Sequence, residues 1–214
     1  ADVLSGNSYG MGTRTFGTEA QTVSDMALEV LRGIEEQDVH AAMKYFPGYG
    51  AASSNMSGFP LINSSLDELK KKEFLPYINA IEQGLDFVIV GHVSVPNVIG
   101  DDTPSSLSEK MISEVLRKAL GFKGVVMTDY LNDANIVKNY SASDAAVKAI
   151  QAGADLLLEP ENFEEAYDGV LKAVKNGKIS EDRIDESLYR IFRVKVTMMD
   201  GTSDTTESEV SSDY

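Results

Sequence analysis

The sequence predicts a parallel α/β fold, in which short buried strands alternate with amphipathic helices. Five runs rich in aliphatic and β-branched residues are typical of strands buried on both faces. They are Ala1–Leu4, Ala41–Phe46, Phe87–Gly91, Val125–Thr128 and Asp155–Leu158. Segments long enough for helical crossovers separate these runs, as parallel neighbours require. An open doubly wound sheet and a closed barrel both satisfy this order.

Local signals mark where several helices begin. Two capping-box spacings, and a serine before an alanine-rich run, predict three helix starts. These signals are Thr18 with Gln21, Ser106 with Glu109, and Ser143. The alanine-rich run stops at Gly153, a residue type that commonly ends helices.

The end of the chain changes character. An amphipathic helix is expected over Ser180–Val196, with Gly177 closing the helix before it. Its apolar face consists of Ile184, Leu188, Ile191 and Phe192. From Asp200 onward the residues are polar and acidic. We therefore expect one domain over residues 1–199 and a flexible acidic tail over residues 200–214.

Composition argues against several classes of partner and excludes chemistry that needs cysteine. Acidic side chains outnumber basic ones 34 to 19, and the formal charge of −15 would repel DNA or an anionic lipid surface. There is no cysteine, which excludes disulfides, zinc thiolate sites and cysteine nucleophiles. No apolar run approaches the roughly 20 residues of a membrane span. We expect neither nucleic acid nor membrane as a partner, and the compartment stays open between cytoplasmic and secreted.

Polar residues follow four of the expected strands, at the end where parallel α/β proteins carry their sites. They are Lys44, His92, Asp129 and Glu159. A carboxylate there is also a common helix cap, so the pattern alone leaves Asp129 open. The position of His92 fits two roles equally well: it could support other site residues by hydrogen bonds, or it could contact the substrate. Glu159 fits a solvated turn, and His40 and Asp155 fit structural roles.

Several motifs occur in a characteristic order. The segment Lys44-Tyr45-Phe46-Pro47-Gly48-Tyr49-Gly50 resembles the Lys-His-Phe-Pro-Gly-His-Gly signature of the β-N-acetylglucosaminidases of glycoside hydrolase family 3. Further segments that resemble this family are Thr13-Arg14-Thr15-Phe16-Gly17, Gly91-His92-Val93, Pro104-Ser105-Ser106-Leu107-Ser108, Gly121-Phe122-Lys123-Gly124-Val125-Val126-Met127-Thr128-Asp129, Ala152-Gly153-Ala154-Asp155 and Arg183-Ile184-Asp185-Glu186-Ser187. The resemblance runs from about Ala1 to Val196.

The resemblance implies a fold, an activity and a set of site residues. The fold is a (β/α)8 TIM barrel, of which this chain would carry about the last five of eight units. The activity is the retaining hydrolysis of terminal β-linked N-acetylhexosamine, from glycosides such as cell-wall fragments, without a cofactor or metal. Asp129 would be the nucleophile, and Arg14, Lys44, Tyr45 and His92 would bind the sugar.

One loop departs from the family pattern. After Gly50 the family enzymes carry an Asp-Ser-His that works as the acid and base, but here Asn55 and Ser57 stand at about these places. Neither side chain titrates near neutral pH, and no carboxylate or histidine lies between Lys44 and Asp67. The acid–base loop is therefore expected to be degenerate.

The degenerate loop and the missing barrel units leave alternatives to an active N-acetylglucosaminidase open. A sugar-binding pseudoenzyme of the same fold would fit the degenerate loop, and a family 3 β-glucosidase is a weaker alternative. A barrel that lacks three units would expose sheet edges and an apolar interior. We therefore expect the chain to bind the missing N-terminal barrel segment or to self-associate.

Overall fold

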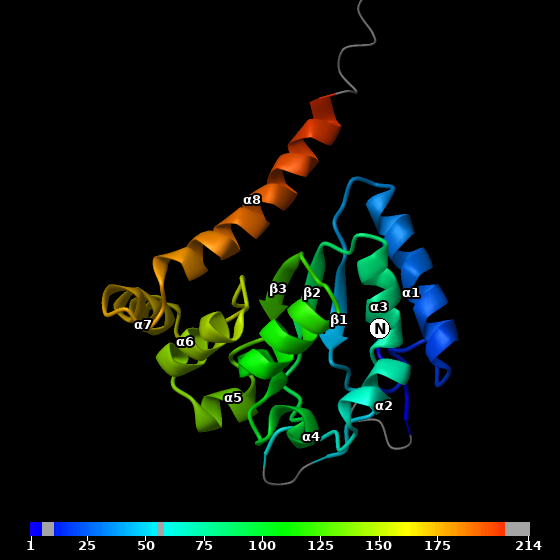
Figure 1. Cartoon of the computed structure of the whole chain (residues 1–214), viewed down its shortest axis with the longest axis horizontal. Coiled ribbons are helices and arrows are strands. Elements are labelled where there is room, and N and C mark those ends of the chain that lie inside the picture. Colours follow the sequence, from blue (N-terminus) through cyan, green and yellow to red (C-terminus); the bar gives the residue numbers. More distant parts are fainter. Residues whose placement is uncertain (6–10, 55–57, 204–214) are drawn as a thin grey trace, which may run out of the picture.

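The computed structural model describes residues 1–5, 11–54 and 58–203. These residues form a three-stranded parallel sheet in the order β1-β2-β3 (Figure 1). The strands are β1 (Ala42–Phe46), β2 (Phe87–Val90) and β3 (Val125–Thr128). In the register of the sheet, Lys44 lies beside Ile89 and Ile89 beside Met127. The parallel α/β prediction is therefore confirmed for the three central runs.

Two of the five expected strands are not strands in the structure. The amides of Leu4 and Ser5 bond to the carbonyls of Gly17 (2.9 Å) and Gly50 (2.8 Å), which belong to loops rather than to a strand. At the other edge of the sheet, Asp155–Leu158 is reduced to an isolated parallel bridge between Leu156 and Met127. This ladder stops because the Leu158 amide bonds to the Thr128 hydroxyl (3.1 Å) instead of a backbone carbonyl.

Helical segments connect and flank the strands. They are α1 (Ala20–Glu35), α2 (Leu66–Lys71), α3 (Leu75–Glu82), α4 (Pro96–Ile99), the 3₁₀ turn η1 (Ser105–Leu107), the π-helical η2 (Lys110–Ala119), α5 (Ala134–Asn139), α6 (Ala142–Ala152), α7 (Phe163–Lys175) and α8 (Glu181–Ser203). Helices α1 and α3 lie beside β1, whereas α6 and α7 pack together beyond β3 (Figure 1).

The predicted helix starts are displaced by one to a few residues. The N-cap of α1 is Glu19 rather than Thr18, and its side chain makes no capping bond. Before η2 it is the Ser108 hydroxyl, not that of Ser106, that accepts a backbone amide, because Ser106 bonds to a histidine ring instead. Helix α6 is capped by Ser141, two residues before the predicted Ser143. Its predicted end is confirmed, since Gly153 has a φ of 115°.

The two faces of the sheet are covered unequally. Side chains on the face toward the helices are buried, among them Met43, Val88 and Val126. On the opposite face Lys44 is exposed, and Ile89 and Met127 are only half-buried. In a closed barrel this second face would line the interior. The described residues therefore leave the inner face partly uncovered.

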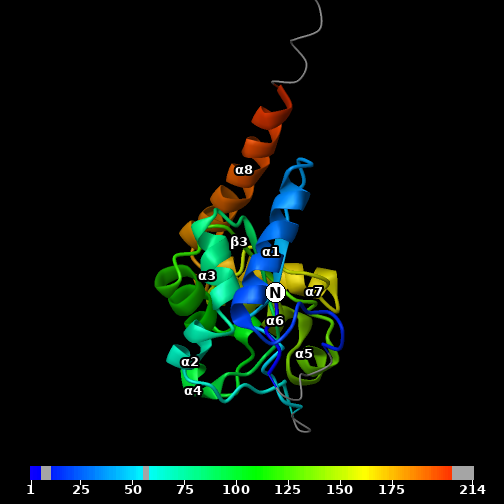
Figure 2. The same cartoon turned by 90° about the vertical axis from the view of Figure 1, so that its right-hand side faces the viewer.

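Helix α8 also presents apolar side chains to solvent. It extends away from the body of the molecule (Figures 1 and 2). Leu188 is 42% exposed and Phe192 is 56% exposed, so the predicted apolar face is only partly used. Because α8 runs to Ser203, it includes the first residues of the predicted tail. Residues 204–214 lie outside the described residues, and the domain boundary remains a prediction.

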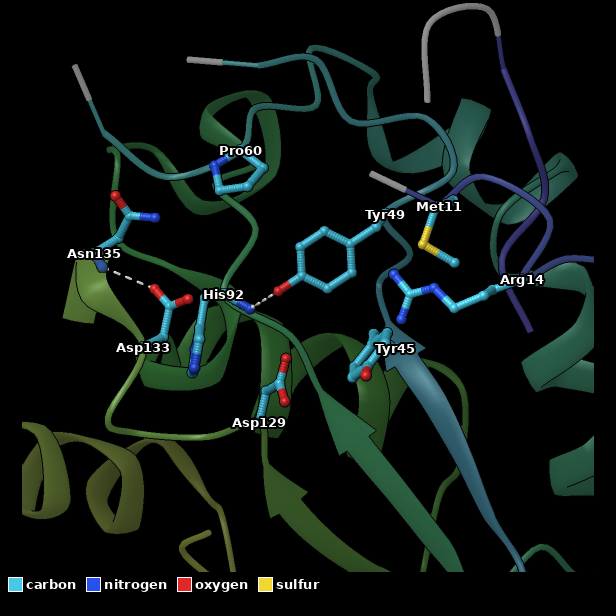
Figure 3. A pocket seen from close by; sticks show the side chains of 9 residues that line it. All are labelled: Met11, Arg14, Tyr45, Tyr49, Pro60, His92, Asp129, Asp133 and Asn135. Carbon is cyan, nitrogen blue, oxygen red and sulfur yellow. Dashed lines mark hydrogen bonds between the residues drawn. The ribbon is translucent and has the colours of Figure 1, made fainter. Parts of the chain in front are cut away.

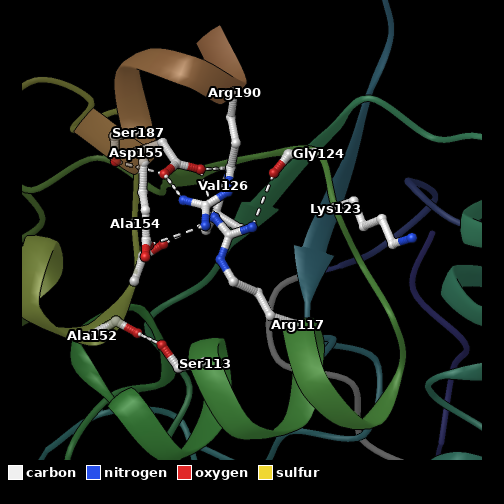
Figure 4. Close-up of polar contacts among 12 residues, drawn as sticks. Ser113, Arg117, Lys123, Gly124, Val126, Ala152, Ala154, Asp155, Ser187 and Arg190 are labelled. Carbon is white, nitrogen blue, oxygen red and sulfur yellow. Dashed lines mark hydrogen bonds and ion pairs between the residues drawn. The ribbon is translucent and has the colours of Figure 1, made fainter. Parts of the chain in front are cut away.

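A buried carboxylate joins several elements beneath the sheet. Asp155 accepts bonds from Arg117 (2.5 Å), Arg190 (2.9 Å) and the Val126 amide (2.9 Å), as Figure 4 shows. Ser187 on α8 adds a hydroxyl bond of 2.6 Å. The structure therefore gives Asp155 the structural role that the sequence indicated. His40 has a structural contact as well, with Nδ1 2.9 Å from Asp86.

We expect Asp155→Ala to lower the free energy of unfolding by about 3–5 kcal/mol, because partly buried guanidinium groups lose their counter-charge. Urea unfolding of the purified variant measures this loss. The control is Glu114→Ala, whose partner Lys110 is half exposed like Glu114 itself. That exposed pair should contribute almost nothing, and equal losses in the two variants would contradict the role given to Asp155.

We also expect the chain on its own to self-associate, because the inner sheet face and the apolar side of α8 are exposed. Sedimentation velocity over a range of concentrations detects this. Replacing Leu188 and Phe192 by serine should reduce association, whereas Lys175→Ser on α7 should leave it unchanged. A chain that stays monomeric at high concentration would contradict the prediction.

Candidate functional site

A pocket of about 180 Å³ opens at the carboxyl ends of the strands (Figure 3). Its lining combines acidic, basic and aromatic side chains that come from segments far apart in the sequence. The lining residues are Met11, Arg14, Tyr45, Tyr49, Pro60, His92, Asp129, Asp133 and Asn135.

Most of the predicted site residues meet in this pocket. Arg14, Tyr45, His92 and Asp129 all line it. Lys44 is not among the lining residues, and its amine lies 5.0 Å from the centroid of the Tyr45 ring. Asn55 and Ser57, the predicted degenerate acid–base positions, lie outside the described residues.

Asp129 follows the last residue of β3. Its backbone amide bonds to the carbonyl of Val90 at the end of β2 (2.8 Å), which extends the ladder one residue past the strand. One carboxylate oxygen, Oδ1, accepts the amide of Tyr130 (2.9 Å). The side chain is half-buried and reaches the pocket. This arrangement holds a carboxylate at a fixed strand end with its other oxygen available for chemistry.

His92 is buried, and both nitrogens of its ring are engaged. Nε2 lies 2.9 Å from the Tyr130 carbonyl, and Nδ1 lies 2.6 Å from the Ser106 hydroxyl. A carbonyl can only accept, so Nε2 carries the proton and Nδ1 accepts from Ser106. Burial lowers the pKa of His92, although the Tyr130 carbonyl and Asp129 act in the opposite direction. The neutral ring therefore fixes the loop that begins at Asp129.

Tyr49 forms one wall of the pocket. Its hydroxyl accepts the backbone amide of His92 (2.8 Å), and its ring meets that of Tyr45 edge to face at 5.2 Å. The ring also lies against Gly91, where an added Cβ would come within 2.7 Å of it. Burial, reinforced by Asp129, raises the pKa of Tyr49 well above its ordinary value. Tyr49 is thus a protonated hydrogen-bonding group in a fixed place.

A buried carboxylate supports that wall. Asp2 accepts the Tyr49 amide through Oδ1, and it is only 3% exposed. Burial raises the pKa of Asp2, while backbone amides of the segment from Tyr45 to Gly50 counteract that rise. The segment at Ala1–Leu4 therefore braces the Tyr49 loop, although it is not the strand that the sequence indicated.

Sequence reasoning missed five lining residues. They are Met11, Tyr49, Pro60, Asp133 and Asn135. For Asp133 a signal was present, because it lies four residues after Asp129 and directly before a helix. Its Oδ1 accepts the Asn135 amide (2.8 Å) and caps α5. Met11 and Pro60 had no chemical signal, since only the folded loops bring them to the pocket.

A pocket with a carboxylate, an arginine and tyrosines at the ends of parallel strands is where proteins of the parallel α/β class carry their binding and catalytic sites. The comparisons with known proteins then give the family. The model for the "Glycosyl hydrolase family 3 N terminal domain" matches residues 1–194. This chain belongs to glycosyl hydrolase family 3, whose solved relatives have the predicted barrel fold.

Individual relatives agree with this assignment. A β-N-acetylglucosaminidase/β-glucosidase of Cellulomonas fimi is 30% identical over 87% of this chain and 35% of its own length. The β-hexosaminidase LpqI of Mycobacterium tuberculosis is 30% identical over 86% of this chain and 49% of its own. A family 3 β-N-acetylglucosaminidase structure from Paenibacillus superposes with a TM-score of 0.88 and 34% identity, covering 99% of this chain and 40% of that one. The chain spans half or less of the length of these relatives.

Two features are absent from the part of the chain that the structure describes. None of the helices there combines the length and apolarity that a membrane span requires. Likewise, the described histidines and acidic residues form no group of three or more that could hold a metal ion.

His92 predicts how stability varies with pH. Because burial lowers its pKa, the unfolded state binds more protons below about pH 6.5, and stability is lost as the pH falls from there toward the folded-state pKa. We expect His92→Gln to remove up to about 1.4 kcal/mol per pH unit from that slope. Urea unfolding between about pH 5 and pH 8 measures it. Equal slopes in the two proteins would contradict a buried neutral ring.

Proposed function

We propose that this chain supplies the nucleophile and sugar pocket of a retaining glycoside hydrolase that releases terminal β-linked N-acetylhexosamine. The observation that carries the proposal is Asp129, a fixed carboxylate at a strand end that shares one pocket with Arg14 and Tyr45. The names of the relatives support the substrate class.

The chemistry follows from the carboxylate. A free oxygen of Asp129 attacks the anomeric carbon, the bond from that carbon to the glycosidic oxygen breaks, and its electron pair stays on the departing oxygen. Water then opens the glycosyl ester, which restores the Asp129 carboxylate and retains the stereochemistry. The Tyr130 amide on Oδ1 and the Val90 carbonyl on the Asp129 amide keep this group in one orientation.

The remaining pocket residues would hold the sugar. Arg14 offers a planar set of donors for hydroxyl or acetamido oxygens. Tyr45 can stack on the sugar ring, and Lys44, near the Tyr45 ring, would contribute from the pocket rim. His92 would shape the pocket from behind, since both of its nitrogens are already bonded.

A second candidate is a sugar-binding pseudoenzyme. The observation that favours it is the segment from Ala51 to Gly58, which contains no histidine or carboxylate. Loss of acid catalysis is typically worth about 100- to 10,000-fold, so such a protein would bind sugars with little turnover. Binding of N-acetylglucosamine without any covalent intermediate would favour this candidate.

The test traps the intermediate. A 5-fluoro N-acetylglucosaminyl fluoride should label the chain covalently, and intact-mass analysis should place one sugar on Asp129. We expect Asp129→Asn to abolish labelling, whereas Asp168→Asn, at an exposed position of α7, should label like the unmodified chain. The corresponding glucosyl reagent should label more slowly if the pocket recognises the acetamido group. Labelling that persists in Asp129→Asn would refute the nucleophile.

A further inference from the structure

A second carboxylate lines the pocket beside the proposed nucleophile. Asp133 lies four residues after Asp129, and both line the same cavity. Figure 3 shows the two side chains on either side of the His92 ring. Both charges also act on that ring in the same direction, raising its pKa against the effect of burial. Two acidic groups are therefore close to one buried imidazole in one pocket.

The proposed reaction needs a proton donor that the loop after Gly50 does not provide, because its residues include no carboxylic acid or histidine. The pocket's other polar groups are unsuited to the task. Both nitrogens of His92 are bonded, and burial lowers its pKa. Burial raises the pKa of Tyr49, and phenols in general titrate near pH 10. An arginine does not release its proton in proteins.

Asp133 is held in place by the start of α5. Its Oδ1 accepts the Asn135 amide (2.8 Å), and its own amide bonds to the Tyr130 carbonyl (3.1 Å). That carbonyl is also the partner of His92 Nε2. The side chain is half-buried, and the helix cap occupies one oxygen, so Oδ2 is the oxygen that can carry a proton. The Tyr130 carbonyl thus holds both the Asp133 amide and the His92 ring.

We propose that Asp133 is the general acid and base of this site, in place of the residues missing from the loop after Gly50; this inference rests on the proposed function. As Asp129 attacks the anomeric carbon, protonated Asp133 gives its proton to the departing glycosidic oxygen and becomes a carboxylate. In the second step that carboxylate takes a proton from water while the water oxygen attacks the anomeric carbon. Asp129 leaves as a carboxylate, and Asp133 is again protonated.

The variant Asp133→Asn separates chemistry from structure. Asparagine is as good an N-cap as aspartate, because its side-chain oxygen can accept the Asn135 amide, but it cannot transfer a proton. We expect hydrolysis of a β-linked N-acetylglucosamine disaccharide to fall at least about 100-fold. Formation of the glycosyl ester from a 4-nitrophenyl glycoside should change much less, because nitrophenolate leaves without a proton. Asn132→Ala is the matched control, because Asn132 lies in the same turn but bonds to Glu159 (3.3 Å) and does not line the pocket.

Azide provides a second readout that a structural role would not move. In Asp133→Asn, azide should attack the glycosyl ester without a base, raise turnover of the nitrophenyl substrate, and give the β-glycosyl azide. Losses that are equal on both substrates, with no azide product, would overturn the proposal and leave Asp133 as a sugar-binding or capping residue. Unchanged hydrolysis of the disaccharide would overturn it as well.

Trapping with the glycosyl fluoride separates the proposed function from the role of Asp133. Trapping with the glycosyl fluoride requires Asp129 but no acid, so it should persist in Asp133→Asn. Failure to trap any sugar on the unmodified chain would refute the proposed function itself. Normal trapping together with an unaltered dependence on the leaving group would refute only the role given to Asp133.

Discussion

The buried carboxylate of Asp155 is the constraint on which the sheet depends. A charge removed from water needs close partners, and three elements supply them: Arg117 from η2, Arg190 from α8 and the Val126 amide from β3. These bonds hold the amino-terminal end of β3 against η2 and α8. The opposite end of this strand leads to the proposed nucleophile, so the network at the amino-terminal end helps to set the position of Asp129.

At the carboxyl ends of the strands, a second set of hydrogen bonds positions the residues of the pocket. The Tyr130 carbonyl receives His92 Nε2 at 2.9 Å and the Asp133 amide at 3.1 Å. One peptide group therefore orients the turn that joins the two pocket carboxylates. The supporting role that the sequence left open for His92 is the one these bonds favour. A family 3 fold with a displaced acid would keep this turn and change only which side chain delivers the proton.

The sequence predicted the three central strands, because buried parallel strands are continuous apolar runs that need no long-range information. It also predicted the convergence of Arg14, Tyr45 and Asp129, since resemblance to a family carries spatial order with it. The prediction for Asp155–Leu158 as a strand was wrong because a side-chain hydroxyl, Thr128, competes for a ladder amide. Such local competition between hydrogen-bond acceptors is decided by geometry that residue types do not specify.

At the site, Asp133 and Tyr49 also show that residue types do not specify where a side chain points. Asp133 has the pattern of a helix cap, and only the fold shows that the cap faces the cavity. Tyr49 differs from the family histidine, but its role as a wall depends on its contact with Gly91, a residue 42 positions away. The sequence thus gave the identity of these groups, whereas their directions follow from tertiary contacts.

The contact between Tyr49 and Gly91 carries an evolutionary consequence. A methyl group at position 91 would overlap the tyrosine ring, so a side chain can be gained there only if the aromatic ring is lost or reoriented. Relatives with a large ring at the position of Tyr49 should therefore keep glycine at the position of Gly91. Any variant that gains a side chain at position 91 would accordingly have to change position 49 as well.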